Sequence, residues 1–184
     1  SYLRLVPHQE APTNICWGDR NRSVLIRVPL GWVGVKDMIK KVNPNYDDEL
    51  KDFSDRQTFE FRCPDGSANI HLLLAGLCVG ARHGLEMKNA LEMAEKLYVD
   101  VNIFHEENKG RLAQLKGLPL SCYESAESLL HLRSHFEKDD VFSPKVIDGV
   151  AAMLMAYKDK GLSEKLYGKN DKIGELVEQY IHHM

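Results

Sequence analysis

Hydrophobic and polar positions follow two different patterns along this chain. In the first third, residues 23–29 are rich in β-branched side chains and stop at a proline, and residues 58–63 alternate polar and apolar side chains. Both patterns are typical of β-strands, the second of a strand with one buried face. Glu60 and Arg62 share one face of that strand. The apolar residues of the other face, which we expect to pack on a core, are Phe59, Phe61 and Cys63.

In the last two thirds, apolar residues recur at helical spacing and polar residues mark where helices begin. The run 68–83 is apolar nearly all round, which predicts a core helix buried on most sides. Ser121 followed by Glu124 forms a capping-box pattern, and Ser143 precedes a proline suited to a first helical position. Asp171 is expected to cap a last helix.

The residues between the two expected strands form a separate stretch. Positions 30–55 mix Gly, Pro, Asn and charged residues around one expected short helix at 35–41, which is typical of an insertion. With 184 residues, and about 150 residues in an average domain, the chain is long enough for one core. We therefore predict a single α+β unit in which short antiparallel strands from the N-terminal third pack with a C-terminal helical group.

Composition narrows the functional classes. The chain carries 24 Lys and Arg against 27 Asp and Glu, a formal net charge of −3, so we expect no nucleic-acid partner. No apolar run approaches the roughly 18 residues of a membrane span, and the first residues lack a signal-peptide pattern, so we expect a cytoplasmic protein without a membrane partner. The cysteines lack the spacing of a disulfide scaffold or zinc site and are expected to be free thiols. They are Cys16, Cys63, Cys78 and Cys122.

Charged residues in the first 70 positions lie beside short apolar strand segments. The guanidinium group pairs bidentately with carboxylates and phosphates, so several arginines on neighbouring strands suggest a site for an anionic substrate and a nucleoside triphosphate. A set of ordinary surface ion pairs explains the same pattern, because such pairs are common and individually weak. The residues concerned are Arg4, Glu10, Arg20, Arg22, Arg27, Glu60 and Arg62.

Three strings of residues, in the same order, resemble consecutive motifs of the glutamine synthetase family. They are RLVPHQEAP at 4–12, NRSVLIR at 21–27 and EFRCPDGSAN at 60–69. The resemblance is close over residues 4–69 and looser in the helical part. It separates the two interpretations of the arginines, since it implies that they form an active site.

The resemblance implies that residues 1–184 are the C-terminal segment of a glutamine synthetase catalytic domain. Residues 1–69 would hold active-site strands and a flap, with an insertion at 30–55, and residues 70–184 would be helical. The family's N-terminal β-grasp domain and upstream catalytic sheet would precede this segment. Because strands taken from a larger sheet expose edges and apolar faces, we expect the isolated segment either to self-associate or to have a mobile flap at residues 4–19.

As a function, the resemblance implies an ATP-dependent glutamate–ammonia ligase, an enzyme of glutamine biosynthesis. ATP would phosphorylate the side-chain carboxylate of glutamate, and ammonia would then attack the γ-glutamyl phosphate. The family uses Mg²⁺ or Mn²⁺ and forms a homo-oligomeric ring. A γ-glutamyl-amine ligase of the same family, or a non-catalytic structural relative, are the alternatives.

Several residues match family positions that contact the substrates. Arg4 matches the arginine that binds the glutamate carboxylate, and Arg62 matches the arginine that holds the reacting γ-carboxylate. Glu10 matches a flap glutamate that handles protons of the ammonia step. Asn21 and Ser23 flank the arginine of the second motif, and they either position it or simply form a polar turn.

Other residues match positions at the phosphates and the metal. Arg22 matches the arginine on the transferring phosphate, Arg27 one near the nucleotide phosphates, and Glu60 a metal ligand. Family members commonly carry a further arginine where this chain has Thr58. Alternation would place Arg56 on the same strand face as Thr58 and Glu60, so it is a candidate substitute in nucleotide binding. Because a single carboxylate does not make a metal site, we expect the segment to be inactive alone.

Overall fold

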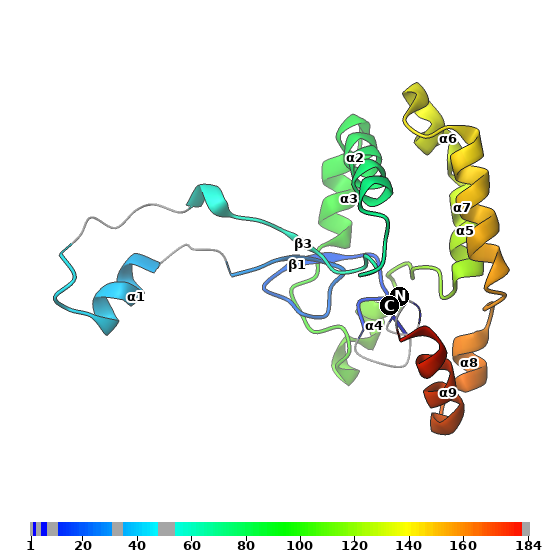
Figure 1. Ribbon diagram of the computed structural model, residues 1–184. Helices are drawn as coiled ribbons and strands as arrows, with labels where there is room; N and C mark the ends of the chain where they lie inside the picture. Colours follow the sequence, from blue (N-terminus) through cyan, green and yellow to red (C-terminus); the bar gives the residue numbers. More distant parts are fainter. Residues whose placement is uncertain (1, 3–4, 7–10, 31–34, 48–53, 182–184) are drawn as a thin grey trace.

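The computed structural model describes residues 2, 5–6, 11–30, 35–47 and 54–181 (Figure 1). The strands are β1 (Trp17–Asp19), β2 (Ile26–Val28) and β3 (Glu60–Phe61). The α-helices are α1 (Val35–Val42), α2 (Ile70–Glu86), α3 (Ala90–Leu97), α4 (Lys109–Leu112), α5 (Cys122–His131), α6 (Arg133–Glu137), α7 (Pro144–Ala156), α8 (Leu162–Leu166) and α9 (Asn170–Tyr180). Short 3-10 turns are η1 (Ser54–Arg56), η2 (Glu106–Asn108) and η3 (Lys138–Asp140). Within this part of the chain, no helix has both the length and the apolar content needed to cross a membrane.

The strands form a small mixed sheet in the order β1-β2-β3. β2 and β3 are antiparallel, with Arg27 opposite Glu60, whereas β1 and β2 are parallel, with Trp17 opposite Ile26. The α+β class is confirmed, but the expected antiparallel arrangement holds for only one of these two pairs. The sequence did not predict β1 because its three residues, centred on Gly18, contain no β-branched side chain.

A buried cluster joins the sheet to the segment that follows α3. Its members are Cys16, Val24, Val99, Ile103 and Leu115. The backbones come close together at Gly18, where a Cβ would lie 2.3 Å from the carbonyl oxygen of Val99. The Val99 N–H also donates to the carbonyl of Trp17 at 2.8 Å. Because a side chain has no room there, this contact requires glycine.

The pair of helices α5 and α7, which lie side by side in Figure 1, forms the centre of the helical part. Both helices begin where the sequence predicts. The Ser121 hydroxyl accepts from the Glu124 N–H at 3.1 Å, and the Ser143 hydroxyl accepts from the Val146 N–H at 3.4 Å. A second buried cluster connects α2 with this pair. It consists of Val79, Phe142 and Ile147.

The helices α2 and α9 form as predicted, but of the two only α2 has a side-chain cap at its N-terminus. The side-chain oxygen of Asn69 caps α2 by accepting from the N–H groups of His71 and Leu72 at 3.1 and 3.2 Å. The prediction that Asp171 caps the last helix is wrong, because α9 begins one residue earlier and its cap position has no side-chain hydrogen bond. Asp171 lies in the first turn, where a negative charge is still favourable near a helix N-terminus.

α2 is more exposed than its apolar sequence predicted. Val79 is buried against α6 and α7, but the opposite side of the helix carries exposed apolar residues at helical spacing. They are Ile70, Leu74, Leu77 and Leu85. Phe59, expected to pack on a core, is 73% exposed. An apolar pattern shows which residues suit burial, but burial also needs a covering segment, and the described residues cover mainly the Val79 side.

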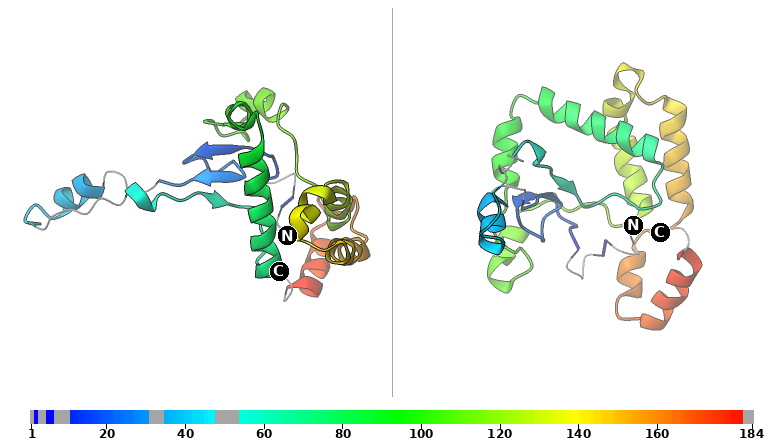
Figure 2. Two further views of the ribbon diagram at one scale, coloured as in Figure 1. Left: turned by 90° about the horizontal axis from the view of Figure 1, so that it is seen from above. Right: turned by 60° about the vertical axis from the view of Figure 1, so that its left-hand side comes forward.

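Between β2 and β3, the described residues 35–47 and 54–59 lie on an arm that projects from the sheet (Figures 1 and 2). The short helix expected at 35–41 is present as α1 within this arm. Met38 and Val42 of α1 are 66% and 86% exposed, so they do not contribute to either buried cluster. The described part of the stretch interpreted as an insertion therefore lies apart from the body of the molecule.

Candidate functional site

The centre of the candidate site is an ion pair between neighbouring strands. The antiparallel register of β2 and β3 places Arg27 directly opposite Glu60, and Nη2 of Arg27 lies 2.5 Å from Oε2 of Glu60. The Arg27 side chain is 25% exposed and that of Glu60 43% exposed, so the pair lies at the surface of the sheet without being fully solvated. Cross-strand neighbours of opposite charge stabilise this register.

Arg62 extends the pair along the same strand face. Its Nε lies 4.0 Å from Oε1 of Glu60, so the carboxylate has a guanidinium near each oxygen. Nη1 of Arg62 donates to the carbonyl oxygen of Val24 at 3.2 Å and also to that of Arg22. Arg62 is therefore held by the backbone that leads into β2 as well as by its acidic neighbour.

The turn that carries Arg22 is tied to a distant part of the chain. The side chain of Arg22 is exposed, whereas its neighbour Ser23 is buried. The Asn21 amide donates to the carbonyl oxygens of Val99 and Val101 at 3.1 and 2.8 Å. The sequence carries no signal for these contacts, because the acceptors are backbone groups 78 and 80 residues away.

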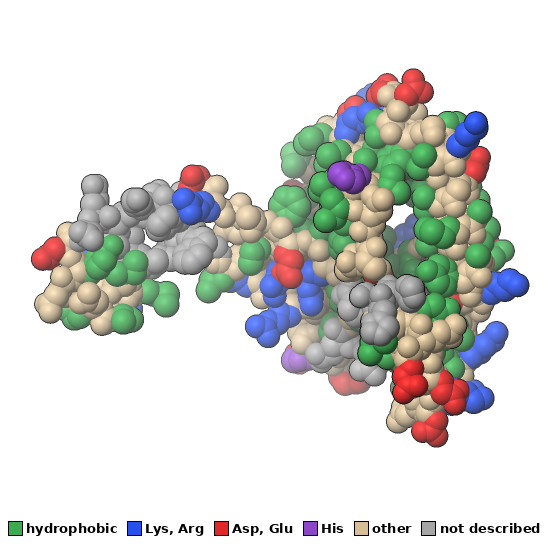
Figure 3. All heavy atoms as spheres, viewed as in Figure 1, with side chains coloured by type: hydrophobic (Ala, Val, Ile, Leu, Met, Phe, Trp, Pro, Cys, Tyr) green, Lys and Arg blue, Asp and Glu red, His purple; other side chains and the backbone are tan. Residues whose placement is uncertain are grey.

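The structure therefore brings together the side chains of Arg27, Glu60 and Arg62, and it joins Arg22 to them through its backbone carbonyl oxygen. Figure 3 shows basic side chains gathered around an acidic group beside the base of the arm. The guanidinium groups of Arg27 and Arg62 beside one carboxylate leave the site net positive, which favours an anionic ligand. In addition, Nε of Arg27 is buried without a hydrogen-bond partner in the described part of the chain. Such an unsatisfied donor is unfavourable until an acceptor, for example a phosphate oxygen, reaches it.

The remaining predicted residues are not part of this group. Arg56 ends η1 and is exposed, and β3 begins only at Glu60, so the expectation that one strand face carries both residues is wrong. The reason is local: η1 and the extended residues after it replace the strand geometry on which the alternation depends. Arg4 and Glu10 lie outside the described residues.

The described residues do not gather three or more His, Cys, Asp or Glu side chains as metal ligands. Glu60 supplies one oxygen donor of the kind that Mg²⁺ and Mn²⁺ prefer. The nearby Cys16 is only 3% exposed, and burial raises the pKa of its thiol. It therefore stays protonated and contributes packing rather than a nucleophile.

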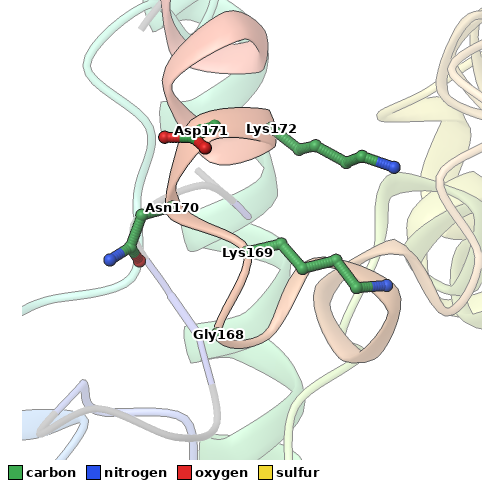
Figure 4. Close-up of a pocket in the computed structure, with 5 residues that line it drawn as sticks. All are labelled: Gly168, Lys169, Asn170, Asp171 and Lys172. Carbon is green, nitrogen blue, oxygen red and sulfur yellow. The ribbon is translucent and has the colours of Figure 1, made fainter.

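A shallow hollow elsewhere on the surface does not belong to this site. It is lined by consecutive residues between α8 and the first turn of α9, drawn in Figure 4. Lys169 and Lys172 point to one side of the segment, and Asn170 and Asp171 to the other. Because the lining comes from one short segment and contains none of the predicted site residues, we assign it no role in the chemistry.

Comparison with known proteins identifies the family of the chain. The family model described as "Glutamine synthetase, catalytic domain" matches residues 1–160. The chain is 31% identical over 166 residues to a glutamine synthetase of Pyrococcus horikoshii, a match that covers 90% of this chain and 30% of that protein. It is 32% identical over 165 residues to a glutamine synthetase of Thermococcus kodakarensis, covering 89% and 30% of the two chains.

A bacterial relative gives the same result. A glutamine synthetase of Streptomyces coelicolor is 31% identical over 148 residues, covering 80% of this chain and 26% of that protein. The chain thus spans about 30% of the length of the archaeal relatives that it matches. The match to the family model extends over β1 to β3 and includes the four grouped site residues. The chain therefore belongs to the glutamine synthetase family and corresponds to part of its catalytic domain.

Proposed function

We propose that the intact protein is an ATP-dependent glutamate–ammonia ligase that makes glutamine through a γ-glutamyl phosphate. The observation that carries this proposal is the net positive group of Arg27, Glu60 and Arg62, held against the backbone of Arg22, in a chain of the glutamine synthetase family. In the same proposal, residues 1–69 form the active-site strands and a flap, and the later residues form a helical support.

The arginines supply the contacts that this chemistry needs. The phosphates of ATP and the carboxylates of glutamate are all negative, and planar guanidinium groups bind such groups through paired hydrogen bonds. We assign Arg22 and Arg27 to the phosphates and Arg62 to the carboxylate that becomes phosphorylated. Arg62 is already held by backbone carbonyls and Arg27 by Glu60, so these donors need little rearrangement as charge moves between the substrates.

Glu60 is proposed as one ligand of a divalent metal ion, Mg²⁺ or Mn²⁺. A carboxylate oxygen fits either ion. When bound, the ion would neutralise charge on the phosphates. The other ligands are expected outside the described residues. The substrate contact of Arg4 and the proton transfer by Glu10 are part of the same proposal.

Two properties of the whole protein follow from this assignment. The segment alone is expected to be inactive, since its described residues supply one metal ligand, Glu60, rather than a set. The intact protein is expected to form a homo-oligomeric ring, as the family does. Arg56, exposed at the end of η1, is proposed as an additional nucleotide contact that the arm presents.

The decisive experiment measures ADP release by the intact protein with glutamate, ATP and Mg²⁺. Ammonium is compared with a panel of organic amines as the acceptor. Glu60→Gln removes the charge but keeps the shape of the side chain, and it is expected to abolish release. The matched control is Glu92→Gln on α3, where the glutamate only pairs with Lys96 at 2.7 Å on an exposed helix surface.

Each outcome has a definite meaning. Ammonium-dependent release that is lost in the Glu60 variant and kept in the Glu92 variant supports a glutamine synthetase with Glu60 at its metal. Release with organic amines only would assign the protein to the γ-glutamyl-amine ligases. No release with any amine would support a non-catalytic relative and reject the proposal.

A further inference from the structure

The turn between β1 and β2 is fixed by one side chain whose hydrogen-bonding capacity is fully used. The Asn21 amide nitrogen donates to the carbonyl oxygens of Val99 and Val101. Its oxygen accepts from the N–H of Ser23 at 2.9 Å and from the Ser23 hydroxyl at 2.7 Å. A primary amide has two N–H donors and two acceptor positions, and all four are satisfied here.

The segment that Asn21 contacts is anchored in the core at two of its residues. Val99 and Ile103 are each 1% exposed, and the N–H of Ile103 lies 3.3 Å from the Ser23 hydroxyl, which accepts from it. Asn21 and Ser23 therefore connect the turn to a loop that two buried side chains, Val99 and Ile103, anchor in the core. An ordinary polar turn would be satisfied by its own backbone and by water, without these long-range partners.

Arg22 lies between these two anchored residues, with its own side chain exposed. Its carbonyl oxygen accepts from Nη1 of Arg62. The backbone at Arg22 is therefore fixed by this bond and by the hydrogen bonds of the residues before and after it. We propose that Asn21 is a positioning residue for Arg22: it locks the turn to residues 99–103 so that the Arg22 guanidinium is held where the phosphate transfers. This inference rests on the proposed function, since it deepens the role of the same site.

The test uses Asn21→Asp in the intact protein. The aspartate keeps the oxygen that accepts from Ser23, but it places a second oxygen against the carbonyls of Val99 and Val101 and removes both donors. We expect kcat for ADP formation to fall by about 10-fold to 100-fold, because small displacements of a positioned group have effects of that size. The KM for glutamate should change little, since Arg62 keeps its contacts to the buried Val24 and to Glu60.

A matched control is available nearby. The side chain of Asn102 is exposed, and its oxygen accepts from the N–H of Phe104 at 3.1 Å. A carboxylate fills the same role, so Asn102→Asp introduces an identical charge change close to the turn and should leave kcat near its wild-type value. Ser23→Ala is a milder second variant in case the Asn21 change prevents folding, and it should lower kcat in the same direction.

A double-mutant cycle with Arg22→Lys separates positioning from a general structural role. If Asn21 acts through Arg22, the loss from Asn21→Asp becomes much smaller once Arg22 is already replaced. If the two losses multiply in full, or if Asn21→Asp leaves kcat unchanged, the inference is wrong.

Amide hydrogen exchange at Val99 and Ile103 tests the lock independently of turnover. Faster exchange at both amides in Asn21→Asp than in Asn102→Asp supports the inference, and equal rates overturn it. If the wild-type protein releases no ADP with any amine, the ligase proposal fails, while the exchange rates still decide whether Asn21 holds the turn.

Discussion

Arg27 and Glu60 face each other across β2 and β3, with 2.5 Å between Nη2 and Oε2, and Arg62 approaches the same carboxylate from the other side. A carboxylate between two guanidinium groups keeps the like charges of the arginines from repelling each other in the absence of ligand. When an anion arrives, the arginines are already in place. In the proposed function, the pair thus links the register of a short sheet to the binding of anionic substrates.

Replacing Arg27 should weaken nucleotide binding more than stability. Arg27→Met keeps the apolar stem but removes the donors, including the Nε that has no partner. A lost charge-assisted hydrogen bond costs about 1.5–3 kcal/mol, so the Kd for ATP should rise roughly 10-fold to 100-fold in a titration of the intact protein. Lys40→Met, on the exposed end of α1, is the control. An equal effect of both substitutions would reject the assignment of Arg27 to the phosphates.

Two glycines should respond oppositely to alanine. A Cβ at Gly18 would lie 2.3 Å from the Val99 carbonyl oxygen, whereas a Cβ at Gly80, in the middle of α2, meets nothing within 4 Å. Gly18→Ala should lower the free energy of unfolding by about 1–3 kcal/mol through overpacking. Gly80→Ala should raise it by about 0.5–1 kcal/mol, because alanine favours a helix. Urea unfolding monitored by circular dichroism would measure both, and a neutral Gly18→Ala would show that the two backbones are not in contact.

The sequence predicts those features of the fold whose interacting residues are close together along the chain. Ser121 and Ser143 were identified as helix starts because a cap and the amide it accepts from are three residues apart. β1 was missed because three residues without β-branching give no strand pattern, and its parallel pairing to β2 depends on the fold. The arginine cluster was predicted from motifs, yet the register that joins Arg27 to Glu60 is visible only in three dimensions.

The wrong predictions have one cause: a local residue pattern shows neither where an element begins nor which segment covers it. Its residue type favours Asp171 as a cap, but the cap position of α9 is Lys169, two residues earlier. Arg56 was placed on a strand face by extending an alternation beyond the point where the strand begins. The burial of α2 was overestimated because an apolar face needs a covering segment, and sequence periodicity does not supply one.

The half-buried thiol of Cys122 should react slowly with alkylating reagents. Burial, and then the neighbouring carboxylate of Asp159, raise its pKa to about 11. Only the thiolate is nucleophilic, so at pH 8 the reactive fraction is small, and it grows as the pH rises toward 11. Iodoacetamide labelling followed by mass spectrometry should modify the exposed Cys78 first. Labelling of both cysteines at the same rate at pH 8 would contradict the raised pKa.

Asp159 has a second role that predicts a loss of stability when it is removed. Its carboxylate accepts from the N–H groups of Cys122 and Tyr123 at 2.8 and 3.0 Å, so it satisfies two amides of the first turn of α5 that the helix cannot pair itself. Asp159→Ala should lower the free energy of unfolding by about 1–2 kcal/mol, as loss of a helix cap does, and should also speed the labelling of Cys122. Asp171→Ala is the matched control, because Asp171 lies in the first turn of α9 without capping it. Urea unfolding measures the stability of both variants. Asp159 accepts hydrogen bonds from two backbone amides, whereas Asp171 is expected to act through the helix dipole. Equal losses would mean that the two hydrogen bonds of Asp159 contribute nothing beyond charge.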